Sequence, residues 1–205
     1  MYYDDILLPT GTLREFRSGN ERADIIIVTK TPPIFSPLEQ RIIQKKIKPL
    51  PHQRLYFSFV KYGNFFPLFS NEVPLPCESY TEKKYSILLF TGIANATPLV
   101  NFLKSKSADI LHIEFHDHHP YSSKDMYDIK EKFNSITKKN KIILTTEKDA
   151  MRIEDPEFLN MIGNLPVYYV PIETAFHAGD KEEFDKQIFD FIRAKYMVKS
   201  TRTKI

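Results

Sequence analysis

Short apolar runs alternate with amphipathic segments along most of the chain, and this alternation strongly limits the folds open to it. The runs are rich in Ile, Val, Leu, Tyr and Phe and are bounded by turn-forming residues, which is typical of β-strands. Several of them lack a polar alternation and therefore predict strands that are buried on both faces. The predicted strands are residues 24–30, 54–60, 85–91, 109–115, 141–146 and 166–171.

The amphipathic segments between these runs predict helices. Ser36 stands before Pro37 and three residues before Glu39, the pattern of a capping box with proline at the first helical position. A single apolar stripe with helical spacing follows Ser122. The predicted helices are residues 36–47, 97–106, 122–139 and 180–197.

Strands that alternate with helices favour an α/β fold with a mainly parallel sheet flanked by helices. The alternation is regular over residues 85–193, which we expect to form one α/β domain. Residues 1–84 contain strands but also an irregular, proline-containing excursion, and residues 194–205 predict a basic, flexible tail.

Composition excludes several classes of protein. The net charge of +3 is too balanced to favour nucleic-acid binding. No apolar run approaches the roughly 20 residues of a membrane-spanning helix, and the first residues do not resemble a signal peptide. Cys77 is the single cysteine, so an internal disulfide and a multi-cysteine zinc site are excluded. We therefore expect a cytoplasmic protein.

Polar residues gather where predicted strands end, which is the ligand-binding edge of a parallel sheet. Residues 115–119 place Asp117 among three histidines, including His118. These residue types serve as metal ligands, acid–base groups or phosphate contacts. The alternative is a polar loop with exposed histidines.

Residues 145–150 follow another predicted strand. Their hydroxyl, carboxylate and amino groups are suited to hold a phosphate, a base or a metal-bound water, and the candidates are Thr146, Glu147, Lys148 and Asp149. The alternative is a helix N-cap in which Thr146 and Asp149 satisfy each other. Spacing alone leaves both interpretations open.

Two further segments are weaker candidates. Arg14 could bind a phosphate through its planar guanidinium, although Arg14 and Glu15 together are more typical of a surface ion pair. Residues 91–95 predict a strand-to-helix turn. A Walker A phosphate-binding loop is absent from the sequence, because none of its six glycines precedes a lysine.

Five motifs together resemble, in order and spacing, those of the tetraacyldisaccharide 4'-kinases, the lipid A 4'-kinases of Gram-negative bacteria. They are DILLPTGTLRE (5–15), RADIIIVT (22–29), FTGIAN (90–95), FHDHHPY (115–121) and TTEKDA (145–150). Members of that family have an interfacial membrane helix, a P-loop and an aspartate-bearing strand before the first of these motifs. The resemblance therefore implies the C-terminal part of a P-loop-kinase-like fold, in which residues 1–84 include the end of the nucleotide-binding core.

The resemblance implies phosphoryl transfer from ATP, with Mg²⁺, to the 4'-hydroxyl of tetraacyldisaccharide 1-phosphate, a lipid A precursor. It makes His118, beside Asp117, the partner of a catalytic base that this sequence lacks. It places Arg14 and Glu15 at the lipid-phosphate substrate. By the same resemblance, the residues bordering the nucleotide are Thr146, Glu147, Lys148 and Asp149, and no metal ligand is assigned.

Without the P-loop region, we expect the chain alone to bind ATP weakly and to be inactive. It would be half of a split kinase with a complementing N-terminal half, or an inactive fragment. An unpaired sheet edge also leaves a homodimer open. Contact with the cytoplasmic face of the inner membrane is expected to be weak without the anchor helix.

An alternative from another class of enzyme is a metal-dependent phosphoesterase with an Asp-His-His motif, which Asp117, His118 and His119 match literally.

Overall fold

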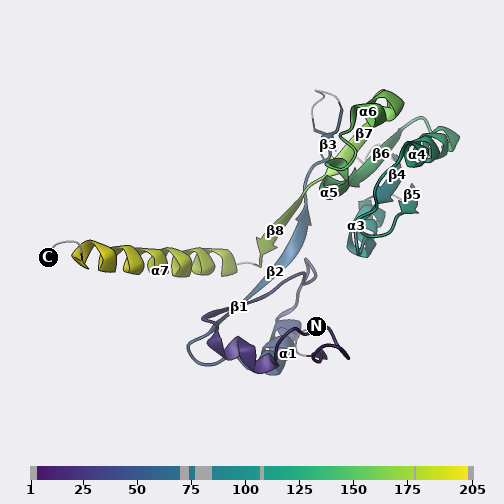
Figure 1. Cartoon of the computed structure of the whole chain (residues 1–205). Coiled ribbons are helices and arrows are strands. Elements are labelled where there is room, and N and C mark those ends of the chain that lie inside the picture. The colour runs from purple at the N-terminus through teal and green to yellow at the C-terminus, as the bar shows by residue number, and fades with distance from the viewer. Residues whose placement is uncertain (1–3, 70–73, 77–84, 107–108, 178, 203–205) are drawn as a thin grey trace. The chain divides into compact units, whose positions relative to one another are not determined.

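The computed structural model describes residues 4–69, 74–76, 85–106, 109–177 and 179–202 (Figure 1). Cys77 lies outside these residues. The chain divides into two compact units, one formed by Met1–Lys61 with Thr174–Ile205 (unit 1) and the other by Tyr62–Glu173 (unit 2).

The sheet of unit 2 has five strands in the order β3-β7-β6-β4-β5. β4, β5, β6 and β7 run parallel to their neighbours, and only the short β3 is antiparallel to β7. The bounds are Phe66–Pro67 (β3), Ser86–Thr91 (β4), Asp109–Glu114 (β5), Lys141–Thr146 (β6) and Val167–Val170 (β7). The predicted α/β class with a mainly parallel sheet is confirmed.

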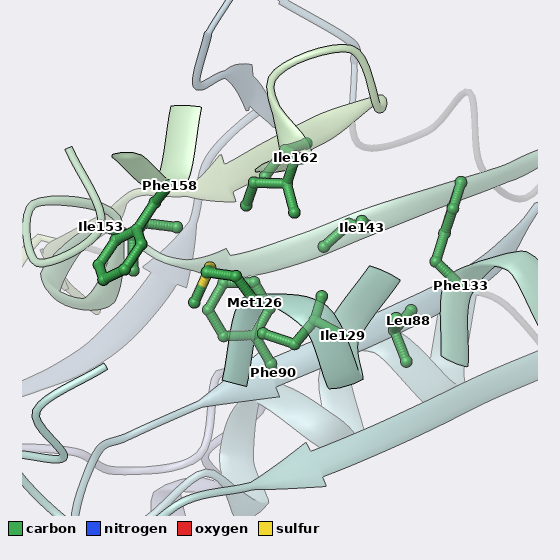
Figure 2. Packing of buried hydrophobic residues seen from close by; sticks show 10 residues of the cluster. Leu88, Phe90, Met126, Ile129, Phe133, Ile143, Ile153, Phe158 and Ile162 are labelled. Atoms are coloured by element: carbon green, nitrogen blue, oxygen red, sulfur yellow. The ribbon is translucent and has the colours of Figure 1, made fainter. Parts of the chain in front are cut away.

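Helices cover both faces of this sheet. They are α3 (Thr97–Lys106), α4 (Ser123–Ser135), α5 (Glu147–Ala150) and α6 (Pro156–Ile162). All six residues of β4 are buried because alternate side chains enter different hydrophobic clusters. Ile87 and Leu89 pack with α3, whereas Leu88 and Phe90 pack with α4 and α6 (Figure 2). This is the physical reason why the sequence of β4 shows no polar alternation.

Figure 2 shows the second cluster from close by. Met126, Ile129 and Phe133 of α4 follow one another at spacings of three and four residues and present one apolar stripe to the sheet. α4 begins where the sequence predicts, because Ser122 and Asp125 form a reciprocal capping box. It ends at Ser135 rather than near residue 139.

Unit 1 is built around a three-stranded sheet in the order β1-β2-β8. β1 (Ile25–Val28) is parallel to β2 (Arg54–Tyr62), and α1 (Pro37–Ile47) connects them. The predicted capping box of Ser36 and Glu39 is present at the start of α1. The remaining elements are a 3-10 helix, η2 (Arg17–Arg22), the strand β8 (Ile172–Phe176) and the long helix α7 (Asp180–Arg202).

The compact units differ from the predicted division at residues 84 and 193. Phe65 lies in the first hydrophobic cluster and β3 pairs with β7, so the chain joins unit 2 well before residue 85. The chain later returns to unit 1, where Tyr56 packs edge-on against Phe176 and Phe184. Residues 194–202, which we expected to be a flexible tail, continue α7.

No helix among the described residues is both long enough and apolar enough to cross a bilayer.

Candidate functional site

The turns that follow β4, β5 and β6 converge at the carboxyl edge of the unit 2 sheet. The backbone N–H of Phe115 donates to the carbonyl of Thr91 over 2.8 Å, which ties the end of β5 to the end of β4. The N–H of Gly92 donates to Oδ2 of Asp149 over 3.0 Å, which ties β4 to the segment after β6. The sheet therefore brings the motifs at residues 90–95, 115–121 and 145–150 into one site.

Asp149 is the anchor of this site. Its side chain is fully buried, and Oδ2 also accepts a hydrogen bond from the hydroxyl of Thr146 over 2.7 Å. Thr146 in turn accepts from the backbone N–H of Asp149 over 3.1 Å and caps α5. The N-cap interpretation of this segment is thus realised by Thr146 and Asp149, while Glu147 and Lys148 remain exposed.

Tyr121 completes the buried side of the site. Burial, followed by the negative charge of Asp149, raises the pKa of Tyr121 above its usual value. A Cβ on Gly92 would lie 3.0 Å from the Tyr121 hydroxyl and 3.2 Å from Oδ1 of Asp149. The close approach of these two side chains is the reason that a glycine suits this turn.

Arg152 joins the three turns. Its Nη1 donates to the carbonyl of Gly92 over 3.1 Å and pairs with Oδ1 of Asp149 over 3.2 Å. Its Nη2 lies 2.9 Å from Nδ1 of His118. The Arg152 side chain is 23% exposed, so the guanidinium is largely withdrawn from water.

His118 lies at the surface of the same site. Its φ of 60° is in the left-handed region, and its N–H donates to the carbonyl of Gly92 over 3.1 Å. The Nζ of Lys148 lies 3.4 Å from Nε2 of His118 and 3.5 Å from Oδ1 of Asp117. The structure thus brings together an imidazole, a carboxylate and an ammonium, with the His118 side chain 70% exposed.

Electrostatics keep Asp117 ionised. Desolvation opposes the negative charge, but the neighbouring His118 ring and the Lys148 ammonium outweigh it, and the pKa of Asp117 lies below its usual value. Asp117 is therefore a negative partner for the cations around it.

His119 belongs to a separate hydrogen-bonded chain. Its Nδ1 lies 3.0 Å from Nε2 of His116, and its Nε2 lies 3.0 Å from Oδ2 of Asp125. His116 in turn contacts the carbonyl of Asp117 through Nδ1. The carbonyl of Asp117 and the carboxylate of Asp125 at the two ends of the chain are acceptors, so the outer nitrogen of each ring is the donor there. Desolvation raises the pKa of Asp125, but the hydrogen bonds from Ser122 and His119 lower it by more, so the pKa of Asp125 lies below its usual value.

Arg14 and Glu15 belong to unit 1 and are both exposed. Glu15 pairs with Arg22 over 2.7 Å rather than with its neighbour Arg14. They are therefore not part of the cluster described in unit 2.

Sequence reasoning missed two residues of the site. Arg152 gave no motif signal, although it stands three residues after Asp149, a spacing that brings side chains together on a helical turn. Asp125 was missed as a partner of His119, although its place three residues after Ser122 marks it as a capping residue.

Among the described residues, no three His, Cys, Asp or Glu side chains are grouped so that they could hold a metal ion.

The fold and the site define an α/β protein whose polar residues lie at the carboxyl edge of a parallel sheet. The sequence profile of LpxK, described as tetraacyldisaccharide-1-P 4'-kinase, matches residues 1–193. The chain belongs to this family.

Individual relatives agree with this assignment. A tetraacyldisaccharide 4'-kinase of Bacteroides thetaiotaomicron is 37% identical over 203 residues, covering 94% of this chain and 52% of the relative. That of Flavobacterium johnsoniae is 34% identical over 193 residues, with coverages of 94% and 52%. The chain thus spans about half the length of the curated relatives it matches.

A solved structure supports the fold. LpxK from Aquifex aeolicus, crystallised as an "apo" form in complex with ATP, superposes with a TM-score of 0.54 at 20% sequence identity. The match covers 91% of this chain and 48% of the solved chain.

Proposed function

We propose that this chain serves in the phosphorylation of the 4'-hydroxyl of a tetraacyldisaccharide 1-phosphate by ATP. The observation that carries this proposal is the family match over residues 1–193. This range includes His118 and the residues around its ring, which are Asp117, Lys148 and Arg152. Catalysis of phosphoryl transfer depends mainly on positioning and on electrostatic stabilisation. An imidazole that is contacted by Arg152 at Nδ1 and surrounded by charged groups is suited to both.

In this proposal, His118 is the partner of the base that accepts the proton of the sugar hydroxyl. Its exposed ring is accessible to a group supplied from outside unit 2. Asp117 and Lys148 set the charge around the ring, since Lys148 lies within 3.5 Å of both.

The nucleotide would border the turn after β6. Glu147 and Lys148 are exposed and are available to a ligand, whereas Thr146 and Asp149 act by holding the turn in place. Arg14 and Glu15 would contact the lipid-phosphate substrate, and their exposure in unit 1 is compatible with this role.

The proposed partners follow from the same reaction. The acyl chains of the substrate imply contact with the cytoplasmic face of the inner membrane. A complementing N-terminal half would supply the base and the ligands of Mg²⁺ and of the ATP phosphates. Self-association as a homodimer is the alternative partner.

A chimera tests this proposal directly. The half of the Bacteroides thetaiotaomicron relative that matches this chain is replaced by this chain, and transfer of ³²P from ATP to tetraacyldisaccharide 1-phosphate is measured. We expect an active chimera, in which His118→Ala lowers kcat by at least tenfold. His52→Ala, at an exposed histidine of unit 1, is the matched control and should leave kcat unchanged.

Three results would contradict the proposal. A folded chimera without 4'-kinase activity would show that this chain cannot perform its half of the reaction. An active chimera that tolerates His118→Ala would remove the role of the histidine. Activity of the chain alone would contradict its need for a complementing half.

A further inference from the structure

The contact between Arg152 and His118 determines which nitrogen of the imidazole carries the proton. The Nη2 of Arg152 lies 2.9 Å from Nδ1 of His118. A guanidinium has only donor groups and stays protonated in proteins. Nδ1 must therefore accept this hydrogen bond, and the proton of the neutral ring is on Nε2.

The position of Arg152 is itself fixed by two other contacts. Its Nη1 pairs with the fully buried Asp149 and donates to the carbonyl of Gly92. The backbone N–H of His118 donates to the same carbonyl of Gly92. The backbone of His118 and the guanidinium that contacts its ring are therefore both held by the Gly92 carbonyl. The φ of His118 is 60°, in the left-handed region.

The contacts on the other side of the ring are longer and come from groups of opposite charge, so the 2.9 Å contact of Arg152 with Nδ1 dominates. Oδ2 of the ionised Asp117 lies 3.7 Å from Nε2 and attracts a proton on Nε2. The Nζ of Lys148 lies 3.4 Å from Nε2 and 3.5 Å from Oδ1 of Asp117, and the carboxylate is the stronger acceptor for this ammonium. Among the described residues, the charged residues with a contact to the His118 ring are Asp117, Lys148 and Arg152.

We propose that Arg152 is a positioning residue that holds His118 as the Nε2–H tautomer and presents this N–H to the reacting groups. His118 then acts as a hydrogen-bond donor, and the proton of the sugar hydroxyl passes to another base and not to His118. The catalytic consequence rests on the proposed function, whereas the tautomer is a property of this chain alone.

The tautomer is measured by long-range ¹H–¹⁵N correlation NMR on the full chain with ¹⁵N-labelled histidine, with His118→Asn used to assign the signals. We expect the pattern of a protonated Nε2 and an unprotonated Nδ1. A protonated Nδ1 in the unsubstituted chain would overturn the proposal. This spectrum decides the tautomer even if a substitution at position 152 prevents folding.

Substitutions then test the role of Arg152. Arg152→Met removes the donor and should yield a mixture of tautomers, whereas Arg152→Lys keeps a donor and should restore the Nε2–H form. Arg41→Met, on the exposed face of α1, is the control and should change nothing. An unaltered His118 spectrum in a folded Arg152→Met variant would refute a positioning role.

Activity of the chimera provides the second readout. Arg152→Met should lower kcat about tenfold or more with little change in KM, since misplacement of a catalytic group can cost up to about 100-fold, and Arg152→Lys should recover part of it. An unchanged kcat would refute the catalytic consequence. An inactive chimera would refute the proposed function while the NMR spectra still judge the tautomer, so the two failures are distinguishable.

Discussion

Replacing Asp149 by asparagine isolates the charge of the buried carboxylate from its shape. The carboxylate accepts from the Gly92 N–H and the Thr146 hydroxyl through Oδ2, and it pairs with Arg152 through Oδ1. In the Asp149→Asn variant, the amide oxygen can keep the first two hydrogen bonds. The amide NH₂ then faces Arg152, so that two donors oppose each other and the guanidinium loses its carboxylate.

The expected loss of stability can be bounded. Removing one partner of a buried ion pair costs about 3–5 kcal/mol. Arg152 is 23% exposed and recovers part of its solvation, so the lower end of this range, about 3 kcal/mol, applies. This is a large share of the total free energy of unfolding of about 5–15 kcal/mol that is usual for a domain.

The assay is native-state hydrogen exchange of the β4 and β6 amides in increasing urea, because these strands report on unit 2. The control is Asp155→Asn, at the exposed N-cap of α6, where Asp155 accepts from the Glu157 N–H over 2.8 Å. Asparagine caps a helix about as well as aspartate, so a change below about 0.5 kcal/mol is expected. A loss at Asp149 below about 1 kcal/mol, or equal to that of the control, would refute the reasoning from the buried pair.

Three further predictions concern stability. Burial raises the pKa of Tyr121, so the folded protein keeps the phenol proton at a pH where the unfolded chain releases it, near pH 10. The contribution of Tyr121 to the free energy of unfolding should therefore be fully present below about pH 10. Above that pH, the free energy of unfolding should fall by up to about 1.4 kcal/mol per pH unit. Urea titrations at rising pH should show a shallower fall for Tyr121→Phe, and an identical slope would contradict this. Ile129→Ala, in the cluster of Figure 2, should cost about 2–5 kcal/mol in urea unfolding, whereas Tyr127→Ala on the exposed face of α4 should cost far less; equal losses would argue against the packing. Ser36→Ala removes a capping box with Glu39 and should cost about 1 kcal/mol at α1, measured by amide exchange there, and unchanged protection would refute the cap.

The elements that could be predicted from sequence depend on local or periodic signals. The buried strands of unit 2 were predicted because β4 and β6 are continuous apolar runs. The start of α1 was predicted because a capping box lies within four residues of the chain. β8 was not predicted, because three of its five residues are exposed and its pattern is too weak to mark a strand. Likewise, the two-residue β3 is defined by pairing with the distant β7.

The candidate site divides along the same line. The histidine and aspartate motif and the motif after β6 were recognisable, since their residue types and their place at strand ends are written in the sequence. Which residues are exposed at the site and which hold the turns was decided by long-range contacts. Asp149 accepts from Gly92, 57 residues away, and Arg152 contacts His118, 34 residues away. Sequence determines local conformation and the faces that are buried. Hydrogen bonds between distant turns exist only once the sheet has aligned the ends of its strands. The anchoring role of Asp149 and the tautomer of His118 therefore depend on the tertiary structure.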